Sequence, residues 1–279
     1  MKKENESVLI EVAQGGNKDA LEELLARYQH WIYNLSLKMV FINSDAEDLT
    51  QEVLLKIAQS IKSFKMQSAF KTWVYRIVVN HMITMQKRQY EHFTNFDEID
   101  LEIKKLPDLP LSGEYDDAHK VLLVEEAKLG CVAAMLMCLD REQRLILLVA
   151  DVMGVEESVA SEIFNISGSN LRKKLSRARS DLYIFMNNKC GLINETNPCR
   201  CEKKTKALIE SGYVDSQKLI FANHFIKQVQ DEQAILSEAL CTLEEQYANL
   251  LRSQQFDSPK TMIPKVISLL ATKNLYKFH

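Results

Sequence analysis

The sequence predicts an all-α protein, with two small helical domains joined by an acidic linker and followed by a helical C-terminal extension. The 279 residues are 46% hydrophobic and 26% charged, as in chains that fold around a packed core. Only 8 Gly and 5 Pro are present, too few turn residues for a β-sandwich of this length. Apolar residues also recur at three- and four-residue steps, the period of one helix face. We place the domains at 1–90 and 127–188, the linker at 91–126 and the extension at 189–279.

The composition also narrows the cellular setting. No run approaches the roughly 20 apolar residues that span a bilayer, and the first residues lack the apolar core of a secretory signal. Six Cys in 279 residues are too sparse for a secreted disulfide framework. We therefore expect a cytoplasmic protein with no membrane partner, whose cysteines are core thiols, reactive thiols or metal ligands.

Charge is sorted along the chain. The net charge is only -3, yet it is -4 over 1–51, +6 over 52–90 and -8 over 91–126. The middle stretch carries seven Lys and Arg and one acid, Glu52. Such a stretch suits contact with an anionic polymer, although a solvated helix face has the same composition.

Three helices are predicted before residue 90. The first begins near Ala20 and has the apolar face Leu21, Leu24, Leu25, Tyr28, Ile32 and Leu35. The second begins at Ser44 or Asp45, where acids suit the positive end of the helix dipole. The third runs from about Ala69 to Arg88 and carries Phe70, Trp73, Val74, Ile77, Val78 and Met82.

The periodic pattern breaks between Glu91 and Glu126. Acids dominate there, Pro107 and Pro110 interrupt any helix, and Ser112 with Gly113 marks a turn. On composition alone this linker is expected to be a disordered tether.

A second helical block runs from about Val121 to Asn188 and ends in a predicted helix-turn-helix. A short helix at 158–164, a turn at 165–167 and a longer helix from Ser169 follow one another. In the longer helix one face is apolar: Leu171, Leu175, Ala178 and Leu182. The opposite face is basic and polar: Ser169, Arg172, Lys173, Ser176 and Arg177. This is the pattern of a recognition helix in a major groove, and the alternative is an ordinary amphipathic surface helix.

Two separated blocks resemble one family, the bacterial RNA polymerase sigma factors of the extracytoplasmic-function type within the sigma-70 family. The first block reads DAEDLTQEV at 45–53 and FKTWVYRI at 70–77, followed by Asn80. It resembles region two, whose acidic helix docks on the polymerase clamp and whose aromatic and basic helix opens and reads the minus-ten promoter element. The second block reads LDREQR at 139–144 and continues through Gly154 to Arg179. It resembles region four, which reads the minus-thirty-five element.

The resemblance gives roles to residues in each block. Asp48, Gln51 and Glu52 share one helix face, so their carboxylates and amide suit an Arg-rich polymerase surface, while a solvated acidic turn is the alternative. Contacts to minus-ten DNA are expected from Lys65, Gln67, Lys71, Arg76, Asn80 and His81. Trp73 shares a face with Ile77 and is expected in the core. Ser169, Arg172, Lys173, Ser176 and Arg177 are the expected minus-thirty-five contacts.

Asn165 stands where the family often has a turn Gly. Asn tolerates the left-handed backbone better than most residues, so the turn between the two helices is expected to survive.

The last third of the chain is the least readable. Cys190, Cys199 and Cys201 could be three thiolate ligands of zinc, with His224 or the partner polymerase supplying a fourth, or a redox-sensitive cluster, or structural cysteines. Basic residues beside them are expected to lower the thiol pKa. A helical face is predicted at Leu236, Leu240, Leu243, Tyr247 and Leu250, and an amphipathic stretch at 263–270. The resemblance implies a built-in regulator, and the alternative is an appendage packed on region four.

The predicted function is a sigma factor that binds core RNA polymerase and directs promoter recognition and transcription initiation. Its expected partners are core RNA polymerase, promoter DNA and an anti-sigma factor. It is predicted to be no enzyme and to need no cofactor, because no P-loop, HExxH or GxSxG motif is present. The alternatives are a helix-turn-helix regulator that binds duplex DNA without polymerase, and a metal- or thiol-dependent protein built on the Cys cluster.

Overall fold

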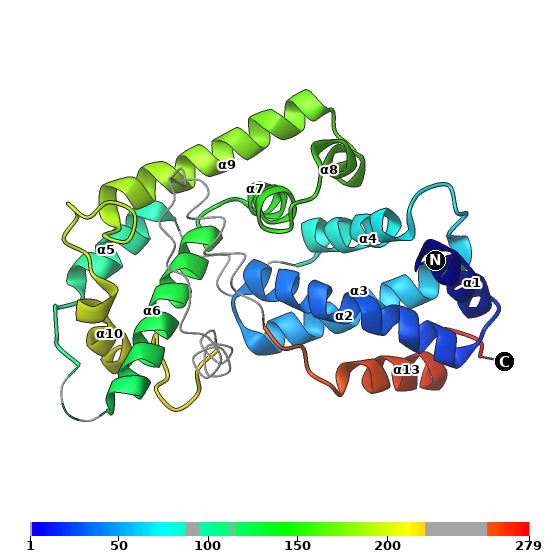
Figure 1. Ribbon diagram of the computed structural model, residues 1–279, viewed down its shortest axis with the longest axis horizontal. Coiled ribbons are helices and arrows are strands. Elements are labelled where there is room, and N and C mark those ends of the chain that lie inside the picture. Colours follow the sequence, from blue (N-terminus) through cyan, green and yellow to red (C-terminus); the bar gives the residue numbers. More distant parts are fainter. Residues whose placement is uncertain (1, 87–94, 112, 114, 221–255, 279) are drawn as a thin grey trace. The chain divides into compact units, whose positions relative to one another are not determined.

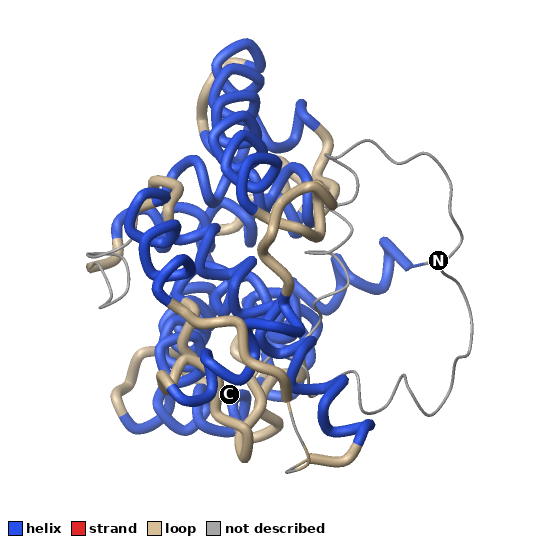
Figure 2. Tube along the Cα trace, turned by 90° about the vertical axis from the view of Figure 1, so that its left-hand side faces the viewer, coloured by secondary structure: helices blue, strands red, loops and turns tan. Residues whose placement is uncertain are grey.

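The computed structural model describes residues 2–86, 95–111, 113, 115–220 and 256–278. Every regular element named over these residues is a helix or a helical turn (Figure 1), and Figure 2 shows these helices connected by loops. The prediction of an all-α fold is confirmed. None of the helices in the described ranges is both long and apolar enough to cross a membrane.

The chain forms two compact units. The first comprises residues 1–87, 157–167 and 257–279, and the second comprises 88–156 and 168–256. Each unit therefore combines segments that are far apart in sequence.

The first unit is built on two long helices. α2 (Lys18–Val40) begins at Asn17, whose side chain accepts a hydrogen bond from the Ala20 amide, and it ends at Phe41, whose φ is 69°. α3 (Asn43–Ser60) packs along α2. The other elements are α1 (Lys2–Gln14), the 3-10 turn η1 (Ile61–Ser63), α4 (Phe70–Thr84), α8 (Glu157–Phe164) and α13 (Met262–Thr272). Their apolar faces form the core, which includes Leu21, Leu24, Leu25, Ile32, Leu35, Leu49, Leu54, Ile57, Val74 and Val78.

The last segment of the chain lies on this first unit (Figure 1). α13 buries Met262, Ile263, Val266, Ile267 and Leu270 and contacts both α2 and α3. The amide of Gln29 donates to Ser258 Oγ and to the Pro259 carbonyl at 2.9 Å each, and the Tyr276 hydroxyl donates to the Ala13 carbonyl. The predicted amphipathic stretch at 263–270 is thus a helix. The alternative that the extension is an appendage packed on region four does not describe this helix, because its apolar face packs on α2 and α3.

The second unit contains α5 (Phe96–Lys105), α6 (Asp117–Met137), α7 (Arg141–Leu147), the π-helical segment η3 (Leu148–Val152), α9 (Gly168–Lys189) and α10 (Cys201–Glu210). The LDREQR run forms the joint between α6 and α7. Asp140 caps α7 in a capping box with Gln143. Arg144 is 2% exposed, and its guanidinium donates to the carbonyls of Leu136, Met137 and Leu139. These bonds satisfy the otherwise unpaired end of α6.

The predicted linker is not a disordered tether over its described residues. α5 begins at Asn95, whose side chain accepts from the Glu98 amide, and α6 begins at Asp116, whose side chain accepts from the His119 amide. Asn95 and Asp116 lower the mean hydropathy of the segment, which favours a prediction of disorder, but in the structure they cap helices. Between the helices, the Leu109 amide donates to the Lys203 carbonyl at 2.8 Å and fixes the segment on α10.

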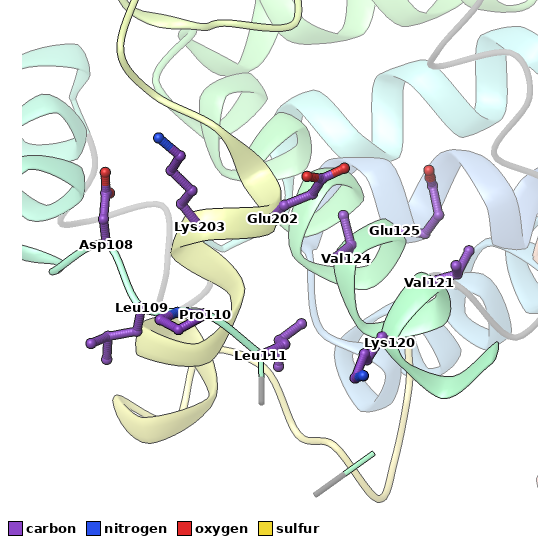
Figure 3. A pocket seen from close by; sticks show the side chains of 10 residues that line it. All are labelled: Asp108, Leu109, Pro110, Leu111, Lys120, Val121, Val124, Glu125, Glu202 and Lys203. Carbon is purple, nitrogen blue, oxygen red and sulfur yellow. The ribbon is translucent and has the colours of Figure 1, made fainter. Parts of the chain in front are cut away.

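A hollow of about 730 Å³ lies where this segment, α6 and α10 meet (Figure 3). Leu109, Pro110, Leu111, Val121 and Val124 make it mostly apolar, and Asp108, Lys120, Glu125, Glu202 and Lys203 surround them. None of the predicted site residues lines it. The predicted face at Leu236–Leu250 and His224 lie outside the described residues.

Candidate nucleic-acid interface

α9 separates an apolar face from a basic one. Leu171, Ala178 and Leu182 are buried, and α9 packs on α7. The five predicted contact residues are all exposed: Ser169, Arg172, Lys173, Ser176 and Arg177. The predicted amphipathic pattern of this helix is confirmed.

Four cations of α9 fall into two groups. Lys174 Nζ lies 2.5 Å from Glu142 Oε2, and Arg179 binds both carboxylate oxygens of Asp151 at 2.7 and 2.8 Å. These two cations hold α9 to α7 and η3. Lys173 and Arg177 form no ion pair with any residue that the structure describes, so their charges remain available to an external anion.

The turn before α9 has the geometry expected of Asn165. Its φ is 53°, in the left-handed region, and the Ile166 amide donates to the Ser161 carbonyl at 3.1 Å. α8 ends at Phe164, so the left-handed residue directly terminates that helix. The prediction that Asn substitutes for Gly here is confirmed.

The second set of predicted DNA contacts lies on α4 and the loop before it. Lys65, Gln67, Lys71 and Asn80 are exposed. Arg76 is 40% exposed, and its guanidinium pairs with Glu162 of α8: Nη2 lies 2.5 Å from Oε1, and Nε lies 3.2 Å from the backbone carbonyl. α8 packs on α4 and buries Ala160 and Ile163. No sequence signal had pointed to Glu162.

Aromatic rings support the beginning of α4. Phe70 stacks on Trp73 with centroids 5.4 Å apart, and Phe64 lies 5.2 Å from Phe70 and 5.3 Å from Trp73. Phe64 and Phe70 are buried, whereas Trp73 is only half-buried and lies less deep than predicted. The cluster fixes the loop that presents Lys65 and Gln67.

The predicted acidic face lies on α3. Asp48 and Glu52 are exposed, whereas Gln51 is half-buried and lines a hollow of about 540 Å³. The other lining residues are Thr261 and the α13 residues Pro264, Lys265, Ser268 and Leu269. His81, predicted to contact DNA, is buried, and its Nε2 lies 2.9 Å from Glu52 Oε2. Its position on α4 thus turns it toward α3, where it orients a carboxylate of the acidic face.

The three predicted cysteines come together with a fourth that the sequence did not single out. Cys131, Cys190, Cys199 and Cys201 line one cavity of about 330 Å³ in the second unit. Among the described residues no group of three or more His, Cys, Asp and Glu side chains is arranged to hold a metal ion, so the suggested metal site is not formed there.

The prediction of lowered thiol pKa values is wrong. Burial raises the pKa of Cys199 despite the opposing charges of Lys204 and Arg200, and it raises the pKa of Cys201 to about 12. Desolvation disfavours the thiolate more strongly here than the neighbouring cations favour it.

Known proteins resemble the chain in the segments described above. Residues 24–91, which hold most of α2 together with α3 and α4, match the family Sigma-70 region 2. The ECF RNA polymerase sigma-E factor of Escherichia coli is 26% identical over 174 residues, which are 62% of this chain and 90% of that protein. The RNA polymerase sigma-H factor of Pseudomonas aeruginosa is 35% identical over 89 residues, 30% of this chain and 46% of that protein. A solved structure of CnrH in complex with the cytosolic domain of CnrY covers 64% of this chain and 96% of its own, with 19% identity and a TM-score of 0.45.

The sequence match begins in α2 and continues through the acidic face of α3 and the cationic surface of α4. The alignment of 174 residues is longer than that region and spans nearly the whole of the sigma-E factor. Residues 24–91 are therefore a sigma-70 region 2, and over 62% of its length the chain is similar to an RNA polymerase sigma factor of the extracytoplasmic-function type.

Proposed function

We propose that the chain acts as an RNA polymerase sigma factor and that three of its surfaces have separate binding roles in transcription initiation. Asp48, Gln51 and Glu52 of α3 bind core RNA polymerase. α4 and its preceding loop bind the minus-ten element, and the exposed face of α9 binds the minus-thirty-five element. In this proposal residues 1–90 and 127–188 supply the two DNA-binding segments, and residues 189–279 are an extension with a regulatory role.

The observation that carries the proposal is the separation of charge in the first unit. α3 presents exposed carboxylates, while α4 and its loop present the cations Lys65 and Lys71. A protein that bound only duplex DNA would gain nothing from an exposed acidic face, because phosphates repel carboxylates. A polymerase subunit needs both surfaces, one for a basic protein partner and one for DNA.

The α9 surface suits a major groove. Arg172 and Arg177 can each donate two hydrogen bonds to guanine O6 and N7, and Lys173 can neutralise a phosphate. Ser169 and Ser176 add short hydroxyl groups that reach bases or phosphate oxygens. The ion pairs of Lys174 and Arg179 hold the helix so that this face stays outward.

The α4 surface suits separated strands. Lys65, Gln67, Lys71 and Asn80 combine cations with amides, which hold the backbone and the edges of unpaired bases. Arg76 must leave Glu162 before it can bind a phosphate. His81 is a positioning residue in this scheme, because its contact is with Glu52 and not with the exposed surface.

The proposal leaves chemistry and cofactors to the polymerase. The chain itself acts by binding, in the cytoplasm where transcription takes place, and its function requires no metal or organic cofactor of its own. An anti-sigma factor is a further proposed partner, and it would inhibit by covering the α3 or α4 surfaces.

The test is co-purification with core RNA polymerase. Asp48→Arg with Glu52→Arg reverses the acidic face and is expected to lower core affinity at least about a hundredfold, because attraction to basic side chains becomes repulsion. Glu11→Arg with Glu23→Arg is the matched control: it reverses two exposed carboxylates elsewhere on the same unit and should leave core binding within about twofold. Equal core binding by both double variants would remove α3 as the docking surface.

A further inference from the structure

Four thiols lie around one cavity of the second unit, and they come from separate segments. Cys131 belongs to α6, Cys190 directly follows α9, Cys199 lies in the connecting loop and Cys201 begins α10. Cys138 directly follows α6, seven residues after Cys131, and is not among the cavity's lining residues. Among the described residues, four thiols are thus clustered, and Cys138 is a separate thiol that serves as a control.

Within this cluster, Cys190 and Cys199 are directly paired by the backbone. They form an isolated parallel β-bridge, in which neighbouring chains run about 4.8 Å apart. A disulfide requires Cα atoms about 4.4–6.8 Å apart. The bridge therefore places these two residues at a separation that one disulfide can span.

Gly191 makes this close approach possible. A Cβ atom at residue 191 would lie 2.1 Å from the Cys199 carbonyl oxygen and 1.9 Å from Arg200 Nη1. No side chain fits at such distances, so any larger residue would push the two segments apart. The bridge between Cys190 and Cys199 therefore depends on the absence of a side chain at Gly191.

The loop between the two cysteines is fixed by its own hydrogen bonds. The Asn197 side chain donates to the carbonyls of Asn187 and Cys190 at 2.9 and 3.2 Å, and the Asn194 amide donates to the Cys190 carbonyl at 3.0 Å. Arg200 Nη2 donates to the Glu195 carbonyl at 2.7 Å. The pair is thus held together before any covalent bond forms, which lowers the entropic cost of closing it.

We propose that Cys190 and Cys199 are an oxidation site at which a hydroperoxide forms a disulfide. Cys199 is half-buried and Cys190 buried, so Cys199 reacts first. Its thiolate attacks the peroxide, an S–O bond forms as the O–O bond breaks, and a sulfenic acid and water or an alcohol result. The Cys190 sulfur then displaces the hydroxyl group as water. With hydrogen peroxide, two thiols and one peroxide give one disulfide and two waters.

The environment predicts a pH-dependent rate. Burial raises the pKa of Cys199, so little of its thiol is ionised at neutral pH. Oxidation is therefore slow at pH 7 and becomes faster toward pH 9, as more thiolate forms. The resulting bond joins the end of α9 to the segment that enters α10, so the site lies at the end of the helix proposed to read duplex DNA.

Mass spectrometry of the full chain tests this directly. The reduced protein is treated with hydrogen peroxide, alkylated and cut by trypsin, which releases residues 190–200 as one peptide because Lys189 and Arg200 flank its two cysteines. A Cys190–Cys199 bond makes this peptide two hydrogens lighter and protects it from alkylation. Further cleavage after Glu195 then leaves its halves joined by the disulfide.

Three variants separate pairing from simple reactivity. Cys138→Ser should leave the bond unchanged, and Cys199→Ser should abolish it. Gly191→Ala keeps every thiol and should lower the yield at least about fivefold. Should Gly191→Ala fail to fold, the mapped bond in the wild-type chain and its loss in Cys199→Ser decide the matter.

Several results would overturn the proposal. A peptide fully alkylated after peroxide treatment at pH 9, or one linked instead to the peptide that begins at Cys201, would exclude the Cys190–Cys199 pair. One equivalent of zinc in protein purified under reducing conditions, with all four thiols protected from alkylation until a chelator is added, would assign the cluster to a metal.

Discussion

α4 and α9 both present cations to solvent, but their surroundings differ. On α4, the guanidinium of Arg76 is paired with Glu162, which α8 brings from more than eighty residues away in sequence. The neighbouring α3 is contacted by α13, from the end of the chain. On α9, Lys173 and Arg177 are exposed and form no ion pair with any described residue, while Lys174 and Arg179 are paired within their own unit.

The difference matters for the proposed DNA contacts. In that scheme the cations Lys173 and Arg177 of α9 are already exposed, whereas Arg76 of α4 has to leave Glu162 before it binds a phosphate. Loss of the Arg76–Glu162 contact would then offset part of the free energy of DNA binding. An exposed ion pair contributes at most about 1 kcal/mol, so this contact modulates binding and does not block it.

The largest expected effect concerns the segment that covers α3. Val266 of α13 is fully buried, so Val266→Asp places a carboxylate against the apolar faces of α2 and α3. We expect the free energy of unfolding of the first unit to fall by about 3 kcal/mol or more, because an unpaired buried charge cannot be compensated there. Thermal or urea unfolding followed by circular dichroism measures it.

Lys265→Asp is the matched control for that change. Residue 265 is exposed on the same helix and lines the hollow beside Gln51, so the same side chain should cost little stability there. Equal unfolding midpoints for the two variants would show that α13 does not pack on α2 and α3, and the comparison of α4 with α9 would lose the part that concerns α13.

The next effect is on promoter binding. Lys173→Ala with Arg177→Ala is expected to weaken binding of the holoenzyme to promoters that the wild-type holoenzyme selects from genomic DNA, by at least about tenfold, since each lost base contact costs about 1–3 kcal/mol. If both residues contact phosphates instead, about two fewer counterions are released on binding, and the plot of log affinity against log salt concentration becomes correspondingly less steep. Core binding should be unchanged.

Lys174→Ala is the control on the same helix. It removes one cation as well, but its ammonium faces Glu142 within the unit. We expect it to lower the stability of the second unit modestly and to leave promoter affinity within about twofold. A larger loss of affinity for Lys174→Ala than for the exposed pair would mean that the outward face of α9 has been assigned wrongly.

Much of the fold could be predicted because local signals agree with tertiary packing. The face of Leu171, Ala178 and Leu182 is buried as its periodicity predicts, and α13 follows from the same pattern. The prediction of a disordered linker was wrong because it used the mean hydropathy of the whole segment. Single residues in that segment, Asn95 and Asp116, cap helices and so favour ordered structure.

The candidate sites show a sharper limit. Helix periodicity predicts which face of a helix a residue lies on, but not which residue packs opposite it. It therefore predicted correctly that Asp48 and Arg177 are exposed. It could not predict the pairing of Arg76 with Glu162, which is far away in sequence. His81 lies next to Asn80 in sequence, yet one residue is a rotation of about 100° around a helix. That step carries it from the exposed surface to Glu52. The prediction of lowered thiol pKa values was wrong for another reason. Burial raises the pKa of Cys199 more than the cations adjacent in sequence lower it.

The smallest expected effect tests the contact that distinguishes α4 from α9. Glu162→Gln keeps the size and hydrogen-bonding capacity of the side chain but removes its charge, so Arg76 is released more easily. We expect open-complex formation by the holoenzyme to increase about two- to fivefold, in line with the small contribution of an exposed ion pair. Glu156→Gln, an exposed acid just before α8, should produce no such increase. In the background of Arg76→Ala the gain from Glu162→Gln should vanish, because the residue it releases is gone. A gain that persists in that double variant would show that Glu162 acts through general charge and not through Arg76.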